Sequence, residues 1–176
     1  LMSNPNERAF KPLKIAVMTV SDTRTEATDR SGDTLVKLLT EAGHELVEKR
    51  IVPDDIYQIR AAVSQWIADD RLNAVITTGG TGITGRDTTP EAVSALFDKQ
   101  IDGFGELFRA LSYEEINTST MQSRAVAGVA NATFLFCLPG STGACRTGWG
   151  KIISHQLDYR TRPCNLVELM PRVLEK

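Results

Sequence analysis

The stretch Ala-Val-Ile-Thr-Thr-Gly-Gly-Thr-Gly, residues 74–82, decides the fold. Its first five residues form a short apolar and β-branched run, which is typical of a strand buried on both faces of a parallel sheet. Glycines follow at once, and their backbone N–H groups can approach an anion without interference from a Cβ. Because ligands of open α/β sheets bind beyond the carboxyl ends of the strands, the loop that begins at Gly79 is a candidate binding site.

Strand and helix patterns alternate on both sides of this stretch. Upstream, residues 15–20 and about 46–52 are expected to be strands; one helix is expected to open at Ser31 or Asp33 and end at Gly43, and another to follow residues 53–55. Downstream, a helix is expected near residues 88–91, where Thr88 and Glu91 have capping-box spacing, and its pattern continues to about residue 115. The alternation predicts a mostly parallel sheet with helices on both faces.

The remaining segments complete this pattern. Residues 125–129 and 133–138 are expected to be strands joined by a turn at Asn131. A last helix is expected around the apolar residues 149–157, and the chain after residue 160 is expected to be irregular. Residues 1–12 lack periodicity and indicate a flexible N-terminal arm, so residues 13–176 are expected to form a single domain.

Composition narrows the class of function. The chain has 176 residues, 24% charged residues and a net charge of -2, so no basic excess favours nucleic acid or anionic lipid. No apolar run approaches the ~20 residues that a membrane span needs, and a cytoplasmic location is expected. Cys137, Cys145 and Cys164 are widely spaced and odd in number, which indicates buried or idle thiols rather than disulfides or zinc ligands. A small-molecule site is the remaining expectation.

A second loop, Pro139-Gly140-Ser141-Thr142, follows another apolar strand and would share the edge of the first loop. Two such loops suit a phosphate cradle; the alternative is that both are tight turns chosen for backbone geometry. Gly80, Gly82 and Gly85 also match the dinucleotide pattern G-x-G-x-x-G, so a nicotinamide oxidoreductase is an alternative. That pattern belongs in the first strand-to-helix turn, whereas here it follows the third expected strand.

Asp54 and Asp87 each follow an expected strand at this edge and are placed to share a magnesium ion near a phosphate cradle. Helix capping is the alternative, above all for Asp54, which has Asp55 beside it. Arg86 either binds phosphate or is a surface charge. Further polar residues that can line the cleft are Ser21, Asp22, Glu106, Ser123 and Arg124, whereas His44 and His155 are expected at the surface and form no Ser-His-Asp arrangement.

These residues belong to a series of short motifs: Thr-Val-Ser-Asp (19–22), Asp-Arg-Ser-Gly (29–32), Ile-Val-Pro-Asp (51–54), the run 77–91, Gly-Phe-Gly-Glu (103–106), Gln-Ser-Arg-Ala (122–125) and Leu-Pro-Gly-Ser (138–141). In this order they resemble the molybdenum cofactor biosynthesis protein B family and, more broadly, the MogA-like molybdopterin-binding domains. Residues 112–128, 139–149 and 160–165 resemble the protein B branch in particular.

The resemblance implies a three-layer αβα sandwich, assembled into homo-trimers or homo-hexamers, that binds molybdopterin. In active members molybdopterin and Mg-ATP give adenylated molybdopterin and pyrophosphate. The resemblance places catalysis and Mg²⁺ on Asp54 and Asp87, and ligand contacts on Ser21, Asp22, Thr78, Gly79, Gly80, Thr81, Gly82, Ser123, Pro139, Gly140 and Ser141.

The resemblance leaves two functions open, catalysis of adenylyl transfer and binding of molybdopterin without catalysis. The complete run from Arg86 to Glu91 favours adenylyl transfer. The protein B pattern after Pro139 favours the alternative, a non-catalytic binding or carrier protein for molybdopterin.

Overall fold

A computed structural model describes residues 7–176 of the chain. Its elements are, in order, β1 (Lys14–Val20), α1 (Arg30–Glu41), β2 (Glu45–Val52), α2 (Ile56–Ala68), β3 (Ala74–Thr78), α3 (Thr89–Ser94), β4 (Lys99–Gln100), α4 (Asp102–Ile116), the 3-10 helix η1 (Asn117–Gln122), β5 (Val126–Ala130), β6 (Thr133–Leu138), α5 (Thr142–Gly148), the π-helix η2 (Trp149–Ile153), α6 (Ser154–Gln156), α7 (Leu166–Leu169) and the 3-10 helix η3 (Met170–Arg172).

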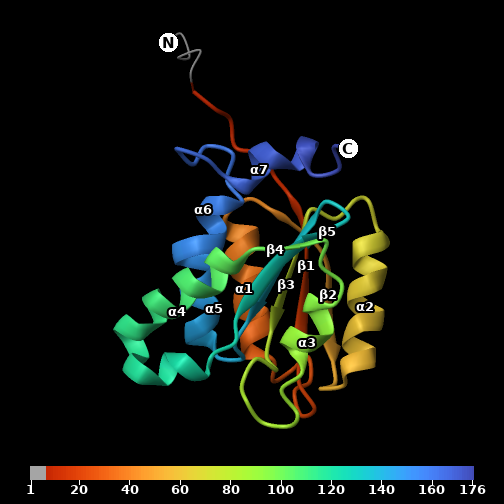
Figure 1. The fold of residues 1–176 in the computed structure, drawn as a ribbon, viewed down its shortest axis with the longest axis vertical. Helices are drawn as coiled ribbons and strands as arrows, with labels where there is room; N and C mark the ends of the chain where they lie inside the picture. The colour runs from red at the N-terminus through yellow and green to blue at the C-terminus, as the bar shows by residue number, and fades with distance from the viewer. Residues whose placement is uncertain (1–6) are drawn as a thin grey trace.

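The sheet has six strands in the order β2-β1-β3-β6-β5-β4. The first four run parallel, whereas β5 is antiparallel to both β6 and β4. Because β1 lies between β2 and β3, the strand order reverses at the β1–β3 pair, which makes this pair a topological switch point. The carboxyl ends of the parallel strands, with their loops, lie at the bottom of Figure 1, and α7 lies at the opposite end.

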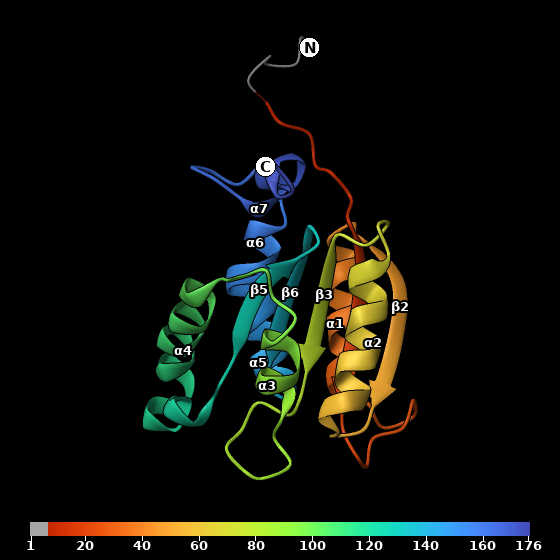
Figure 2. The same cartoon turned by 45° about the vertical axis from the view of Figure 1, so that its right-hand side comes forward.

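Helices cover both faces of the sheet, as Figures 1 and 2 show, and the expected three-layer αβα sandwich is confirmed. The helices α1, α4 and α5 pack on one face, and α2 and α3 pack on the other. Alternate residues of β1 feed the two cores: Ile15 and Val17 face the first, Ala16 and Met18 the second, and all four are fully buried. Burying an Ile or Val contributes about 1.5–3 kcal/mol, so β1 is fixed from both sides.

Helix starts differ from the expected ones where buried side chains take the capping role. Asp29, rather than Ser31 or Asp33, caps α1 by accepting a hydrogen bond from the Gly32 N–H. The expected capping box at Thr88 is absent, since Thr88 makes no side-chain cap bond and the carboxylate of Glu91 pairs with Arg124. A three-residue spacing alone does not show which partner an acidic side chain will take.

Later elements show further differences. The helical pattern expected from residue 88 to about 115 is divided into α3 and α4 by the short strand β4. The C-terminal segment is not wholly irregular, because Asn165 caps α7 in a reciprocal capping box with Glu168. This segment holds part of the expected N-terminal arm: the Lys11 Nζ lies 3.8 Å from the ring centroid of Tyr159. The rest of the arm, residues 1–6, lies outside the described residues.

His44 is buried, so the surface position expected for it is wrong. Its Nδ1 accepts a hydrogen bond of 3.0 Å from the Leu13 N–H, and its ring packs edge-on against Trp149. Burial lowers the pKa of His44, although Asp158 nearby acts in the opposite direction. The burial of His44 and the hydrogen bond accepted by its Nδ1 favour a neutral imidazole with a structural role. His44 lies just before β2, at the end of the sheet opposite to the carboxyl-edge loops.

Candidate binding site at the carboxyl edge of the sheet

The loop after β3 turns in a way that requires glycine. Gly79 and Gly80 have φ angles of +102° and +70°, in the region that other residues rarely adopt. A Cβ on Gly79 would lie 2.3 Å from the carbonyl oxygen of Val20, and one on Gly80 would lie 2.2 Å from the Oγ1 of Thr89. The turn is fixed by the Gly79 N–H, which donates to the Leu138 carbonyl at 2.9 Å.

The loop after β6 lies against the first loop. The Thr78 hydroxyl donates to the Pro139 carbonyl at 2.8 Å, and the Ser31 hydroxyl donates to the Gly140 carbonyl at 2.7 Å. A Cβ on Gly140 would lie 3.4 Å from the Cα of Gly79, so the two backbones are in close contact. The two loops that the sequence placed at one edge therefore form a single structure.

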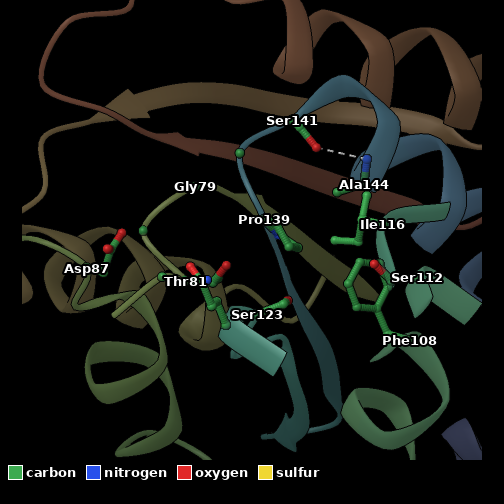
Figure 3. Close-up of a pocket in the computed structure, with 14 residues that line it drawn as sticks. Gly79, Thr81, Asp87, Phe108, Ser112, Ile116, Ser123, Pro139, Ser141 and Ala144 are labelled. Carbon is green, nitrogen blue, oxygen red and sulfur yellow. Dashed lines mark hydrogen bonds between the residues drawn. The ribbon is translucent and has the colours of Figure 1, made fainter. Parts of the chain in front are cut away.

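A cavity of about 400 Å³ opens beside these loops (Figure 3). In Figure 3, Phe108, Ile116 and Ala144 lie on one side of it, and Thr81 and Ser123 lie on the other. The first side, the apolar wall, is mainly apolar but also contains Ser112, and the opposite side is the polar wall. Its lining residues are Gly79, Gly80, Thr81, Gly82, Asp87, Phe108, Ser112, Ile116, Gln122, Ser123, Pro139, Gly140, Ser141 and Ala144.

The polar wall has unused hydrogen-bonding groups. Within residues 7–176, the backbone N–H groups of Gly80, Thr81 and Gly140 donate to no protein acceptor. The Ser123 hydroxyl is buried and also lacks a protein partner. Buried polar groups are normally paired, so this set of free donors beside a cavity indicates a ligand with several acceptor oxygens.

A second cavity of about 260 Å³ adjoins the first, and both are lined by Gly79 and Gly140. It also contains Asp29, which is buried and accepts a hydrogen bond of 2.7 Å from Thr19 and an ion pair of 3.0 Å from Lys49. Burial alone would raise the pKa of Asp29, but these partners hold it below its ordinary value. The base of the smaller cavity therefore holds a fixed, ionised carboxylate.

Asp54 is free of the capping role that the sequence left open. Asp55 is the N-cap of α2, and its carboxylate accepts from the N–H groups of Tyr57 and Gln58. The Asp54 N–H is held by the carboxylate of Asp22, which also pairs with Arg86. Burial and the charge of Asp22 raise the pKa of Asp54 above its ordinary value. A cation placed here would relieve that unfavourable charge.

Asp87 also lies next to the glycine loop. Its carboxylate accepts hydrogen bonds from the Thr84 hydroxyl at 2.7 Å and the Thr84 N–H at 2.9 Å, and these bonds lower its pKa. A Cβ on Gly82 would lie 2.7 Å from the Asp87 Oδ2, and one on Gly80 would lie 3.3 Å from the Asp54 Oδ1. The two carboxylates thus flank the segment from Gly80 to Gly82.

The expected site residues differ in which of the two adjoining cavities they line. Those that line the larger cavity are Gly79, Gly80, Thr81, Gly82, Asp87, Ser123, Pro139, Gly140 and Ser141. Ser21 and Thr78 line the smaller cavity, whereas Asp22 and Asp54 line neither and lie beside the glycine loop. Glu106 lies apart from all of these, in a small separate cavity between α4 and β5.

The apolar wall was missed by the sequence analysis. Phe108, Ser112, Ile116 and Gln122 reach the cavity from α4 and η1. Phe108 lies four residues after Phe104 and both belong to the core, so helical spacing does not reveal that Phe108 also borders a cavity. Within residues 7–176, no group of three or more His, Cys, Asp or Glu side chains is placed to hold a metal. No helix of this part of the chain is long and apolar enough to span a membrane.

Together these features define an open α/β-sheet protein with two adjoining cavities at the carboxyl edge of its sheet, the smaller of them beside the β1–β3 switch point. Residues 16–159 match the family model described as a probable molybdopterin binding domain. The molybdenum cofactor biosynthesis protein B of Escherichia coli strain K12 is 58% identical over 156 residues, which cover 89% of this chain and 92% of that protein. The protein of the same name from Bacillus cereus is 48% identical, with coverage of 88% and 92%.

Solved structures agree. A crystal structure of a molybdenum cofactor biosynthesis protein B has a TM-score of 0.83 at 49% identity and covers 85% of this chain and 94% of its own. The tungsten cofactor synthesizing protein MoaB from Pyrococcus furiosus has a TM-score of 0.74 at 41% identity, with coverage of 84% and 94%. The chain belongs to the molybdenum cofactor biosynthesis protein B family, and its place is in molybdenum cofactor biosynthesis.

Proposed function

We propose that this protein binds molybdopterin in the larger cavity and adenylates it with Mg-ATP. The observation that supports this most is the division of the cavity into an apolar wall and a wall of unpaired donors. Molybdopterin has a flat ring system at one end and a phosphate at the other. The cavity offers a matching surface to each end, in the manner of small-molecule sites that combine apolar contact with a few convergent polar groups.

The orientation of the pterin follows from the two walls. The ring system packs against Phe108, Ile116 and Ala144, where contact with apolar atoms is favourable. The phosphate faces the N–H groups of Gly80 and Thr81, two residues that line the cavity and whose N–H groups have no protein acceptor. These amides stabilise the phosphate charge without having to reorganise when the ligand binds.

Asp54 and Asp87 fit a magnesium ion by their chemistry and placement. Mg²⁺ binds through one or two carboxylates together with substrate phosphate oxygens, and these two carboxylates flank the phosphate loop. Burial and the charge of Asp22 raise the pKa of Asp54, so a cation beside this carboxylate would be favourable. Mg²⁺ would supply charge neutralisation for the phosphates of ATP.

The residues of the chain then have separate tasks. Asp54 and Asp87 would hold a magnesium ion and its nucleotide beside the glycine loop, and the loop amides would hold the pterin phosphate. An oxygen of that phosphate attacks the α-phosphorus of ATP in line, the bond from the α-phosphorus to its bridging oxygen breaks, and pyrophosphate leaves. Positioning of the reactants and stabilisation of the phosphate charge contribute most of the rate enhancement, as in other phosphoryl transfers.

An anaerobic incubation with molybdopterin and Mg-ATP tests this proposal, with adenylated molybdopterin followed by chromatography. We expect product from the wild type and a loss of about 100-fold or more in Asp87→Ala, because a metal-holding carboxylate is removed. Asp70→Ala is the matched control, since Asp70 is exposed and lies before β3, at the opposite end of the strand from the glycine loop. Bound pterin without product in the wild type would instead make this a non-catalytic binding or carrier protein.

The assembly state is a second part of the proposal. We infer that the protein works as a homo-trimer or homo-hexamer. The support is a set of large apolar side chains that are exposed in the single chain on α4 and η1: Leu107, Tyr113, Ile116 and Met121. Apolar side chains gathered on neighbouring elements are typical of surfaces that pack against another subunit.

A further inference from the structure

Arg124 is joined to the loop between β3 and α3 by its whole guanidinium group. Its Nε donates to the Gly82 carbonyl at 2.7 Å, its Nη2 donates to the Asp87 carbonyl at 2.8 Å, and its Nη1 pairs with the carboxylate of Glu91. One side chain therefore ties three points of a ten-residue stretch, Gly82 to Glu91, to the start of β5. It does not line either of the two adjoining cavities.

The backbone of the same residue holds a different part of the loop. The Arg124 N–H donates to the Thr81 carbonyl at 3.0 Å. This bond does not use the side chain, so Arg124→Lys keeps the anchor at the Thr81 carbonyl. The carbonyls of Gly82 and Asp87, by contrast, are held by the guanidinium.

This loop has two other anchors: Arg86 pairs with Asp22, and the Thr89 N–H donates to the Gly80 carbonyl at 3.0 Å. Ile83, Thr84, Gly85 and Arg86 are exposed, and the loop extends beyond the edge of the sheet in Figure 2. Asp87 is held locally by Thr84, which moves with it. Those anchors hold Arg86 and Thr89, whereas Arg124 holds the Asp87 carbonyl itself from outside the loop.

We propose that Arg124 is a positioning residue for the reaction: it sets the place of Asp87 without touching the substrate, an inference that rests on the proposed adenylyl transfer. Arginine suits this task because its planar guanidinium directs several donors at once, whereas the lysine ammonium is a single point of contact. Displacement of a metal-holding carboxylate by about 1 Å can lower the rate roughly 100-fold. Because the amides at Gly80 and Thr81 are held independently, pterin binding should be spared.

The test compares Arg124→Lys with Arg60→Lys. Arg60 is a matched control because its guanidinium also donates to two backbone carbonyls, those of Glu91 and Ala92, but it does not contact Asp87. Amide hydrogen exchange of residues 82–88 should rise about tenfold to 100-fold in Arg124→Lys alone, since charge-assisted hydrogen bonds to this loop are lost. Unchanged exchange in this folded variant would overturn the proposal.

Kinetics separate positioning from loss of folding. In Arg124→Lys we expect kcat to fall about 10- to 100-fold while the Kd for molybdopterin changes less than about threefold. In the Asp87→Ala background the same substitution should add little further loss, because both act on one group. Fully additive losses, or equal losses in Arg60→Lys, would show that Arg124 does not act through Asp87.

The exchange measurement needs no turnover, which keeps the two proposals distinguishable. If the wild type binds molybdopterin and forms no adenylated product, adenylyl transfer fails. Arg124 is then judged as the anchor of Asp87 by hydrogen exchange alone, and unchanged exchange again overturns that role.

Discussion

At the scale of single residues, the site depends on backbone positions that only glycine fills at low cost. Gly79 combines a φ of +102° with a Cβ position 2.3 Å from the Val20 carbonyl oxygen. We expect Gly79→Ala to lower the free energy of unfolding by about 2–5 kcal/mol, because backbone strain and overpacking act together. Urea denaturation measures this difference.

Gly103 gives the comparison at the same scale. It lies in the first turn of α4, and a Cβ placed there meets nothing within 4 Å. Gly103→Ala should be neutral or stabilise by up to about 1 kcal/mol, because alanine has the higher helix propensity. Equal effects of the two substitutions would show that local crowding does not set the requirement for glycine at residue 79.

At the scale of elements, the turn between β5 and β6 has backbone strain at Ala132 that a substitution can relieve. Asn131 and Ala132 have φ angles of 47° and 62°, and both lie in the left-handed region. Asparagine tolerates this region and here also donates to the Ile67 carbonyl at 2.8 Å, but alanine has no such compensation. Two-residue turns of this kind favour Asn-Gly.

Ala132→Gly should therefore stabilise the protein by about 1 kcal/mol and raise Tm by about 2–4 °C. Thermal unfolding followed by circular dichroism measures the shift. Ala132→Val is the control, and it should lower Tm, since a β-branched side chain is strained further at positive φ. A glycine variant that melts at or below the wild-type temperature would contradict the strain assigned to this turn.

The elements themselves differ in how readily the sequence predicts them. β3 and β6 are continuous apolar runs followed by glycine or proline, and both lie where the sequence placed them. The two-residue strand β4 has exposed, polar residues and is formed by pairing with β5, so its own sequence contains no signal. The cap of α1 differs from the expected one: Asp29 is buried and pairs with Lys49 on β2, a partner distant in sequence that a local pattern does not reveal.

At the scale of the whole molecule, the candidate site was predictable on one wall only. The polar wall consists of loops that follow strands, and glycine, serine and aspartate at such places are visible in the sequence. The apolar wall comes from α4 and η1, and only tertiary packing places Phe108 opposite the loops. Apolar residues that pack in the core and apolar residues that line a cavity recur with the same helical spacing, so the spacing cannot distinguish them.

Assembly into oligomers is also a property of the whole molecule, and we expect the subunits to contact one another through the surface of α4 and η1. Met121 is 79% exposed and Tyr113 is 52% exposed in the single chain, and both lie near Ile116, which borders the larger cavity. Carboxylates introduced at Tyr113 and Met121 would be unpaired and buried in an interface, at a cost of several kcal/mol. We therefore expect a trimer or hexamer mass for the wild type by analytical ultracentrifugation and a monomer mass for Tyr113→Glu with Met121→Glu.

Tyr57→Glu is the matched control for this assembly. Tyr57 is 73% exposed on α2, which covers the opposite face of the sheet in Figure 2, so its substitution should leave the mass unchanged. A monomeric wild type would remove the proposed assembly, and an assembled double variant would place the contact on another surface. Because Ile116 belongs to both the exposed set and the cavity, the monomeric variant should also bind molybdopterin more weakly than the assembled protein, whereas Tyr57→Glu should not.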